Sequence, residues 1–287
     1  MNILYIEPYY VGSHKQWIES YSNASKHSID IISLKASKWK WRMHGGAITL
    51  AYEFKKLNKK YDLIISSDYL NLPVFRSYCR KEISATPIIT YFHENQLSYP
   101  WPPYDEDNKL KRDLHYHFIN YSTSLVSDWN LFNSKYHMDI YFDYLKKYLK
   151  KMPDLNNMSS INEIVNKSDV LHLGCNLQRF SRDKLRKGII PTILWNHRWE
   201  YDKNPELFFN TLFKIQKQNI DFKLIIIGKS FERCPDIFHT AKKILKDNII
   251  QFGFCDSFED YNRFLNMSDI LPITSNQDFF GISAVEG

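Results

Sequence analysis

Short runs of apolar, β-favouring residues alternate along this chain with longer segments that have the 3.6-residue period of amphipathic helices. The strands of a parallel sheet are covered by helices on both faces, so their sequences are continuous apolar runs. Each helix between two strands returns the chain to the edge of the sheet where the next parallel strand begins. The alternation therefore predicts an α/β protein built on doubly wound parallel sheets. In the first half, the predicted strands are 3–6, 29–33, 63–66, 88–92, 129–133 and 170–173, and the predicted helices are 15–24, 47–58, 71–81, 107–124 and 134–151.

The alternation stops once and then starts again. Residues 177–188 are polar and basic with no apolar run, and we interpret them as a linker between an N-terminal domain (1–176) and a C-terminal domain (189–287). The second domain has predicted strands at 192–195, 223–227, 249–252 and 270–273, and predicted helices at 205–217, 236–247 and 258–266. Because it is short and ends at Gly287 in what reads as the opening of a helix, we expect this domain to be incomplete at its C-terminal end.

The bulk composition, 44% hydrophobic and 24% charged, is typical of a folded globular protein. The first residues lack the basic start and the long apolar stretch of a signal peptide, and no segment approaches the roughly 18 apolar residues of a membrane span. We therefore expect a cytoplasmic protein without a membrane partner. The four cysteines are scattered and show no zinc-ligand spacing, so no metal site is expected, and the net charge of +6 suits phosphate-bearing ligands.

A pair of cations follows the first predicted strand of the second domain. Arg198 and Lys203 lie in the loop that leads to a helix opened by Asn204 and Pro205. Open α/β sheets bind ligands beyond the carboxyl ends of their strands, and a helix start adds unpaired backbone N–H donors. A guanidinium and an ammonium group at this position favour a diphosphate-binding site, although a solvated surface pair is the alternative.

A second polar cluster closes the chain around a glycine at a predicted strand-to-helix turn. Asp278 and Glu286 are eight residues apart on either side of Gly281, a spacing close to two helical turns. Both carboxylates can therefore face one ligand, and the glycine permits close approach of the backbone. We assign to the same donor-binding site Gly228, Phe254, Ser275 and Phe280.

Together, Arg-x4-Lys at 198–203 and Ser-x2-Asp-x-Phe-Gly-x4-Glu at 275–286 resemble the donor site of the retaining GT-B glycosyltransferases. The resemblance implies two Rossmann-like domains facing across a cleft. It also implies that Arg198 and Lys203 bind the donor diphosphate, that Asp278 contacts the sugar and that Glu286 binds the ribose. The family usually has Glu where this chain has Asp278, whose side chain is one methylene shorter.

Four further segments, at 6–15, 38–42, 91–97 and 196–206, are similar to those of one branch of that family, the tRNA-queuosine α-mannosyltransferases. This resemblance runs from the first residue to the last. It implies transfer of mannose from the nucleotide sugar GDP-mannose to queuosine in a tRNA anticodon. It further implies retention of the anomeric configuration, with no metal and no cofactor besides the nucleotide sugar.

Polar residues also follow the first and fourth predicted strands of the N-terminal domain. Gly12 and Ser13 form a turn before a helix that could meet the donor diphosphate, and a plain tight turn is the alternative. His93 can bond a sugar hydroxyl or the reacting region and is our fourth catalytic candidate beside Arg198, Lys203 and Asp278, although a lone histidine is more often structural. With the acceptor or the RNA we associate His14, Lys15, Glu94, Asn95 and Gln96.

The segment that contains Lys38, Trp39, Trp41 and Arg42 interleaves cations with indoles. Single-stranded RNA is bound in this way, since charges follow phosphates and rings stack on bases. The alternative is a basic edge whose tryptophans anchor the core. The later basic run at 146–151 is more typical of a solvated helix face.

Two other functions remain compatible with these residues. The first is a GT-B enzyme that uses another donor sugar and a glycan, lipid or small-molecule acceptor. It would have an amphipathic docking helix beside the first-domain site, which the sequence does not show. The second is a non-catalytic RNA- or nucleotide-binding protein that has kept the fold. The sequence favours no particular oligomeric state.

Overall fold

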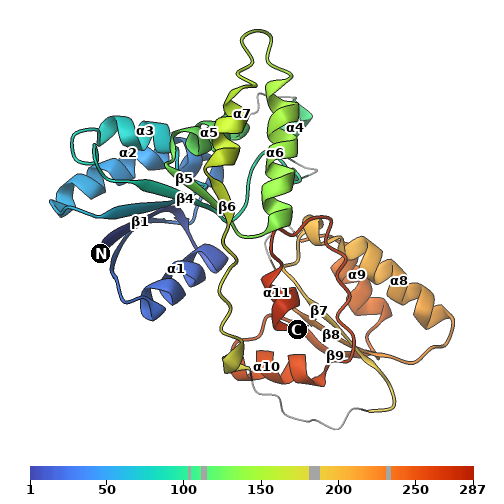
Figure 1. Ribbon diagram of the computed structural model, residues 1–287. Coiled ribbons are helices and arrows are strands. Elements are labelled where there is room, and N and C mark those ends of the chain that lie inside the picture. The colour runs from blue at the N-terminus through green and yellow to red at the C-terminus, as the bar shows by residue number, and fades with distance from the viewer. Residues whose placement is uncertain (103–104, 111–114, 181–187, 231–233) are drawn as a thin grey trace. The chain divides into compact units, whose positions relative to one another are not determined.

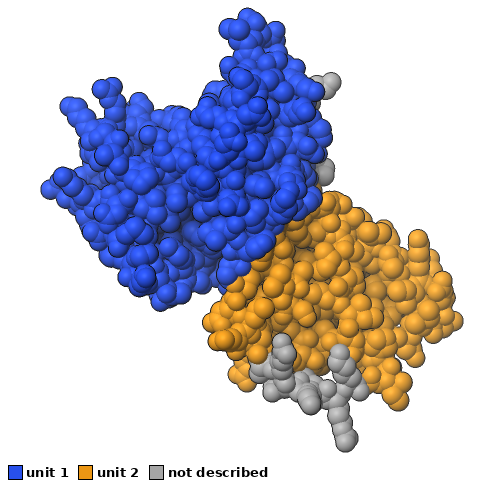
Figure 2. All heavy atoms as spheres, viewed as in Figure 1, with its two compact units in different colours: residues 1–174 blue, residues 175–287 orange. Residues whose placement is uncertain are grey.

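A computed structural model describes residues 1–102, 105–110, 115–180, 188–230 and 234–287 (Figure 1). The chain divides into two compact units, Met1–Gly174 and Cys175–Gly287 (Figure 2). Each unit contains its own parallel sheet, and the doubly wound α/β prediction is confirmed. Among the described residues, no helix combines the length and the apolar character needed to cross a bilayer.

The sheet of unit 1 has the order β2-β1-β3-β4-β5-β6, and all its strands are parallel. Because β1 lies between β2 and β3, the chain winds outward from β1 in both directions. The point between β1 and β3 is therefore the topological switch point, where ligands bind in open α/β sheets. The strands are β1 (Asn2–Tyr10), β2 (Ser28–Lys35), β3 (Leu63–Ser67), β4 (Ile88–Phe92), β5 (Trp129–Phe132) and β6 (Ser168–Val170).

The helices of unit 1 cover both faces of this sheet (Figure 1). On one face α1 packs through Ile18 against Ile3, Tyr5 and Tyr91. On the other face, alternate residues such as Leu4 pack against α2 and α3, and a second cluster buries residues of α5, α6 and α7. The helices are α1 (Gly12–Ala24), α2 (Trp39–Leu57), α3 (Leu72–Tyr78), α4 (Glu106–Lys109), α5 (His115–Val126), α6 (Lys135–Leu149) and α7 (Ser160–Asn166).

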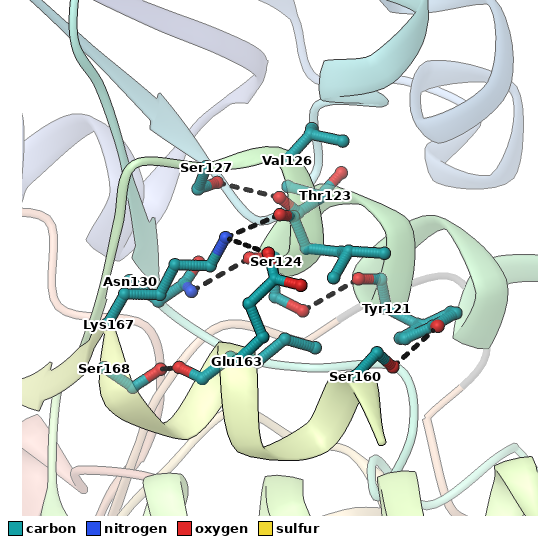
Figure 3. A network of polar contacts seen from close by, with 12 residues as sticks. Tyr121, Thr123, Ser124, Val126, Ser127, Asn130, Ser160, Glu163, Lys167 and Ser168 are labelled. Atoms are coloured by element: carbon teal, nitrogen blue, oxygen red, sulfur yellow. Dashed lines mark hydrogen bonds and ion pairs between the residues drawn. The ribbon is translucent and has the colours of Figure 1, made fainter. Parts of the chain in front are cut away.

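A polar network attaches α7 and β6 to the rest of unit 1 (Figure 3). Lys167 Nζ donates to the Leu125 carbonyl at 2.6 Å, at the end of α5, and the hydroxyls of Tyr121 and Ser160 lie 2.9 Å apart. The buried Asn130 side chain donates to the Ser124 carbonyl at 3.0 Å. These contacts fix the edge strand β6 beside β5 and supply hydrogen bonds that its short ladder does not.

Unit 2 contains the sheet β7-β8-β9, also parallel. Its strands are β7 (Thr192–Asn196), β8 (Lys223–Ile227) and β9 (Ile249–Gly253), and its helices are α8 (Pro205–Lys217), α9 (Ile237–Ile244), α10 (Phe258–Met267) and α11 (Ile282–Glu286). Trp195, Phe209 and Phe238 join α8 and α9 to one face of the sheet. Phe264 joins α10 to the other face, so unit 2 also has three layers.

Several predicted elements differ from the structure. Residues 270–273 form no strand, since the chain makes a single bridge between Ile270 and Ile193. Helix α2 begins at Trp39 rather than 47, β6 begins at 168 rather than 170, and α7 was not predicted. The predicted helix 107–124 corresponds to α4 and α5, with 111–114 outside the described residues. Of the predicted linker, Leu177–Arg179 forms a 3-10 turn, and 181–187 lie outside the described residues.

Candidate functional site

The switch point of unit 1 holds a buried carboxylate, Glu7, which directly follows the last residue of β1 that pairs with β3. Its Oε1 accepts hydrogen bonds from Tyr9 N at 2.8 Å and from Ser67 Oγ at 3.0 Å, at the end of β3. Its Oε2 accepts from Tyr5 OH at 3.0 Å and contacts His14 Nδ1 at 2.9 Å. A carboxylate has about four lone-pair positions, so Glu7 is saturated by protein donors.

His14 and His93 stack beside this carboxylate with ring centroids 4.1 Å apart. Burial by itself lowers the pKa of His14, but the contact with Glu7 and the nearby Asp68 and Glu94 raise it to about 9. His14 is therefore an imidazolium at neutral pH. Burial, and then the charge of His14, hold the pKa of His93 well below its usual value, so His93 is neutral.

Asp68 follows β3 directly and is completely buried. Its Oδ1 accepts from His93 N at 2.9 Å, and Asn133 Nδ2 donates to the His93 carbonyl at 2.8 Å. Both peptide groups of His93 are therefore fixed. Burial raises the pKa of Asp68 well above its usual value, opposed by the charge of His14.

The residues after His93 bond mainly to one another. Tyr69 OH and Gln96 Nε2 donate to Glu94 Oε1 at 2.7 and 2.9 Å. Asn95 is fully buried, and its Oδ1 accepts from the backbone and hydroxyl of Ser98 at 2.9 and 3.1 Å. Asn95 thus shapes a turn, and Glu94 is the least buried of the three predicted acceptor residues at 94–96.

Glu7, His14 and His93 offer ligand atoms within 4.8 Å of one another, a set that could in principle hold a metal ion. His14 Nδ1 carries a proton donated to Glu7, because Oε2 at 2.9 Å is an acceptor. A metal ion would have to displace that proton. The geometry therefore fits a buried ion pair, and we assign no metal to it.

The predicted diphosphate turn of unit 1 lies on the surface, where Gly12 and Ser13 open α1. Gly12 has φ of +54°, which favours glycine. Lys15 is exposed and lies 3.8 Å from Glu19. His14 differs from these neighbours, since it is buried and points inward to Glu7.

The segment predicted to bind RNA forms the start of α2. Trp39 is half-buried and packs with Tyr116 and Trp101, so this indole anchors the core. Trp41 is 64% exposed, and its ring lies over Gly45, where a Cβ atom would approach to 2.6 Å. Lys38 is exposed, and Arg42 donates to the Lys35 carbonyl at 3.1 Å. The two tryptophans thus have different environments.

In unit 2 the structure brings Lys203 and Asp278 together. Lys203 Nζ lies 2.6 Å from Asp278 Oδ1 and 3.0 Å from Asp202 Oδ2, and the Lys203 and Asp202 side chains are 9% and 2% exposed. Thr274 Oγ1 donates to the Lys203 carbonyl at 2.8 Å, and Asn276 N donates to the Asp202 carbonyl at 2.9 Å. These bonds hold the segment before Asp278 against the turn after β7.

Arg198 is the more accessible cation of the predicted pair, with 49% of its side chain exposed. Its guanidinium lies 2.9 Å from Glu200 Oε2 and 3.8 Å from the buried Asp202. Asp202 therefore stands between Arg198 and Lys203 and fixes their spacing. A diphosphate that binds these cations must compete with carboxylates already near them.

Glu286 lies in a different set of contacts. Arg179 Nη2 is 2.8 Å from its Oε1, and Tyr261 OH donates to its Oε2 at 2.8 Å. Asn196, at the end of β7, donates to Tyr261 OH at 2.8 Å. The neighbouring His197 lies 3.1 Å from Ser283 Oγ, and burial, then Lys203, lower its pKa to about 4. These bonds tie α11 to the carboxyl end of β7.

The other predicted donor residues have distinct environments. Gly228 has φ of +141°, and a Cβ atom there would lie 1.9 Å from the His197 carbonyl, so the fold itself requires glycine. Gly281 has φ of +74° at the start of α11. Ser275 Oγ is buried with no hydrogen-bond partner among the described residues. Phe254 is 64% exposed, whereas Phe280 is partly buried.

The sequence-based prediction missed Glu7, Asp68 and Asp202. Glu7 and Asp68 are acidic residues at or just beyond the carboxyl ends of apolar strands, which was an available signal. Asp202 directly precedes Lys203. Only the strand order shows that β1 and β3 are adjacent, so the convergence of Glu7 and Asp68 required the structure.

Comparisons with known proteins show the family to which the chain is similar. A family model described as the tRNA-queuosine alpha-mannosyltransferase N-terminal region matches residues 2–175, and the glycosyl transferases group 1 model matches 178–287. A tRNA-queuosine alpha-mannosyltransferase from Drosophila melanogaster is 32% identical over 295 residues, which cover 99% of this chain and 76% of that protein.

Solved structures show the same fold at low sequence identity. The catalytic domain of starch synthase IV from Arabidopsis thaliana has a TM-score of 0.68 and 11% identity, covering 100% of this chain and 80% of that one. A glycosyltransferase from Rickettsia africae has a TM-score of 0.60 and 19% identity, covering 100% and 76%. The predicted GT-B fold is confirmed, and the chain belongs to the tRNA-queuosine α-mannosyltransferase family of glycosyltransferases.

Proposed function

We propose that this protein transfers mannose from GDP-mannose to queuosine in a tRNA anticodon, with retention of the anomeric configuration and without a metal ion. The observation that carries the proposal is the 32% identity, over 99% of the chain, to a tRNA-queuosine alpha-mannosyltransferase. The pairing of Lys203 with Asp278, from two motifs far apart in the sequence, supports a donor site in unit 2.

The proposed reaction breaks the bond between the mannose anomeric carbon and the β-phosphate oxygen. A new bond forms from that carbon to a hydroxyl oxygen of queuosine, and the hydroxyl proton passes to the departing phosphate. Negative charge develops on the phosphate, and Arg198 and Lys203 stabilise it. Fixed cations of this kind can serve where other transferases use a divalent ion.

Titration with nucleoside diphosphates tests the donor half of the proposal. We expect GDP to bind with measurable heat at one site per chain, and UDP and ADP to bind more weakly. Isothermal titration calorimetry measures this directly. If none of the three diphosphates gave heat, the proposal would fail in favour of an RNA-binding protein that has kept the fold.

Replacement of Trp41 by Ala tests where the tRNA binds. Stacking of an aromatic side chain on a base contributes about 1–3 kcal/mol, so we expect the affinity for tRNA to fall about tenfold. The fold should be unaffected, because Trp41 is 64% exposed. Electrophoretic mobility shift with queuosine-bearing tRNA measures the affinity.

Two variants serve as controls for that experiment. Tyr52→Ala removes another aromatic residue of α2, 58% exposed, and should leave tRNA affinity unchanged. Trp39→Ala should instead lower the melting temperature, because this indole packs in the core. An unchanged tRNA affinity for Trp41→Ala would show that the RNA does not contact this end of α2.

A further inference from the structure

The hydrogen bonds around Glu7 determine which nitrogen of His93 carries the proton. Tyr5 OH lies 3.0 Å from Glu7 Oε2 and 3.4 Å from His93 Nε2. A tyrosine hydroxyl has one hydrogen, and a carboxylate oxygen can only accept. Tyr5 therefore donates to Glu7, and its oxygen accepts from His93, so His93 carries its proton on Nε2 and has a lone pair on Nδ1.

The other hydrogen bonds to Glu7 are consistent with a proton on His93 Nε2, because each donor around the carboxylate then has an acceptor. Oε1 is occupied by Tyr9 N and Ser67 Oγ, and Oε2 by Tyr5 OH and His14 Nδ1. When His14 donates from Nδ1, four donors meet the roughly four lone-pair positions of a carboxylate, and every group is satisfied. The tautomer of His93 thus follows from counting donors and acceptors.

The ring of His93 is also held in place. Its backbone N–H and carbonyl are bonded to Asp68 and Asn133, and its face stacks on His14 at 4.1 Å. The rings of Trp17 and Tyr91 also contact it edge to face, with centroids at 5.3 and 4.8 Å. The ring therefore has little freedom to turn.

His93 Nδ1 is buried and has no hydrogen-bond partner among the described residues. Asp68 Oδ2 and Asn95 Nδ2 share this property at the same edge of the sheet. Unpartnered buried polar atoms are rare in native proteins, and a cluster of them at a switch point indicates a place where a polar ligand group binds.

We propose that Tyr5, Glu7 and His14 are positioning residues that hold His93 in the tautomer with a bare Nδ1, which accepts a hydrogen bond from a substrate hydroxyl. The second half of this inference rests on the proposed function, since both the mannosyl donor and the queuosine diol carry hydroxyls. The tautomer of His93, by contrast, is a property of the unliganded protein.

The charge of His14 supports this role, because an imidazolium stacked on His93 opposes a second positive charge there. The ionisable groups that face His14 are Glu7 from β1, Asp68 and Tyr69 after β3, and His93 and Glu94 at the end of β4. The acids raise the pKa of His14 to about 9 against the effect of burial. His14 therefore stays charged until the pH approaches that value.

Nitrogen-15 NMR of the histidine-labelled protein tests the tautomer. At pH 7.5 we expect His93 to show a protonated Nε2 and an unprotonated Nδ1, and His14 to show two protonated nitrogens. Loss of signals in His93→Gln and His14→Gln assigns the two rings. A protonated Nδ1 on His93 in the unaltered protein would overturn the proposal.

Glu7→Gln should reverse the tautomer. The backbone donor of Tyr9 requires the amide oxygen at the Oε1 position, so the amide NH2 occupies the Oε2 position and donates to Tyr5. Tyr5 OH then donates to His93 Nε2, which moves the ring proton to Nδ1. Because Nδ1 becomes a donor, we expect kcat for transfer to fall at least about tenfold, with GDP affinity unchanged. An unchanged His93 tautomer in this variant would also overturn the proposal.

Two further variants keep the test decisive if Glu7→Gln folds poorly. Tyr5→Phe leaves the Glu7–His14 pair intact but removes the partner of Nε2, so His93 should populate both tautomers while His14 stays charged. Glu19→Gln changes an exposed glutamate of α1 and should alter neither ring. A single Nε2-protonated form in Tyr5→Phe would show that Tyr5 does not fix the ring.

Substrate titration in the same NMR experiment identifies the hydroxyl. A shift of Nδ1 on adding GDP-mannose alone would identify a donor hydroxyl, and a shift only with queuosine-bearing tRNA would identify the acceptor diol. No shift with either would overturn the binding half of the inference. The tautomer of His93 is measured without substrate, so failure of the proposed function is distinguishable from failure of the positioning role.

Discussion

Replacing Lys203 by Ala is expected to lower the free energy of unfolding of unit 2 by about 3–5 kcal/mol and to abolish measurable transfer. The ammonium group lies 2.6 Å from Asp278 and 3.0 Å from Asp202, and the latter side chain is only 2% exposed. Removing the cation leaves a buried carboxylate with the Arg198 guanidinium 3.8 Å away. Urea denaturation followed by tryptophan fluorescence measures the loss, since Trp195 and Trp199 lie in the unit 2 core.

Matched variants separate charge from packing in that experiment. Lys217→Ala removes an exposed lysine of α8 and should leave stability within about 0.5 kcal/mol of the unaltered protein. Adding Asp278→Asn to Lys203→Ala should recover part of the stability, because one uncompensated carboxylate is gone, without recovering activity. If Lys203→Ala were as stable as Lys217→Ala, the buried pairing described for unit 2 would be wrong.

Replacing Arg198 by Ala is expected to lower the rate of transfer about a hundredfold while leaving the fold intact. The guanidinium is 49% exposed, so its loss should cost little stability. In the proposed reaction Arg198 stabilises charge that develops as the phosphate departs, so the loss should fall on kcat. Steady-state release of GDP in the presence of queuosine-bearing tRNA measures this rate.

Arg198→Lys provides the conservative comparison. Lysine keeps the charge but loses the forked geometry that bonds two phosphate oxygens, so we expect partial activity between that of Arg198→Ala and the unaltered protein. Glu200→Gln, which removes the acid 2.9 Å from Arg198, should retain most activity. Near-normal turnover by Arg198→Ala would remove this residue from the donor site.

The sequence predicted the fold class and most strands because buried parallel strands leave a strong apolar signal. The predictions were wrong for elements whose structure depends on tertiary contacts. Residues 270–273 are apolar but form one bridge with Ile193. Helix α7 is short, and polar contacts such as that of Lys167 with Leu125 hold it in place. The residue before α2 is Lys38, which makes no side-chain cap, so no capping signal in the sequence marked the start of this helix.

For the candidate site, the sequence indicated which residues belong together but not how their side chains are oriented. Motif spacing placed Arg198, Lys203 and Asp278 in one site, and the structure joins the last two. The partner of Glu286, Arg179, lies 107 residues earlier in the chain, and no local pattern connects them. His14 was grouped with the RNA contacts from its place in a motif, whereas its ring turns inward to Glu7. Orientations of this kind depend on strand order and helix phase.

We propose that this glycosyltransferase moves mannose onto queuosine in tRNA. Incubation with radiolabelled GDP-mannose and queuosine-bearing tRNA, followed by digestion to nucleosides and chromatography, tests it most directly. We predict label in a mannosylated queuosine nucleoside and none when the same tRNA carries guanosine at that position. Absence of label from the queuosine nucleoside, or equal label in both tRNAs, would contradict the claim.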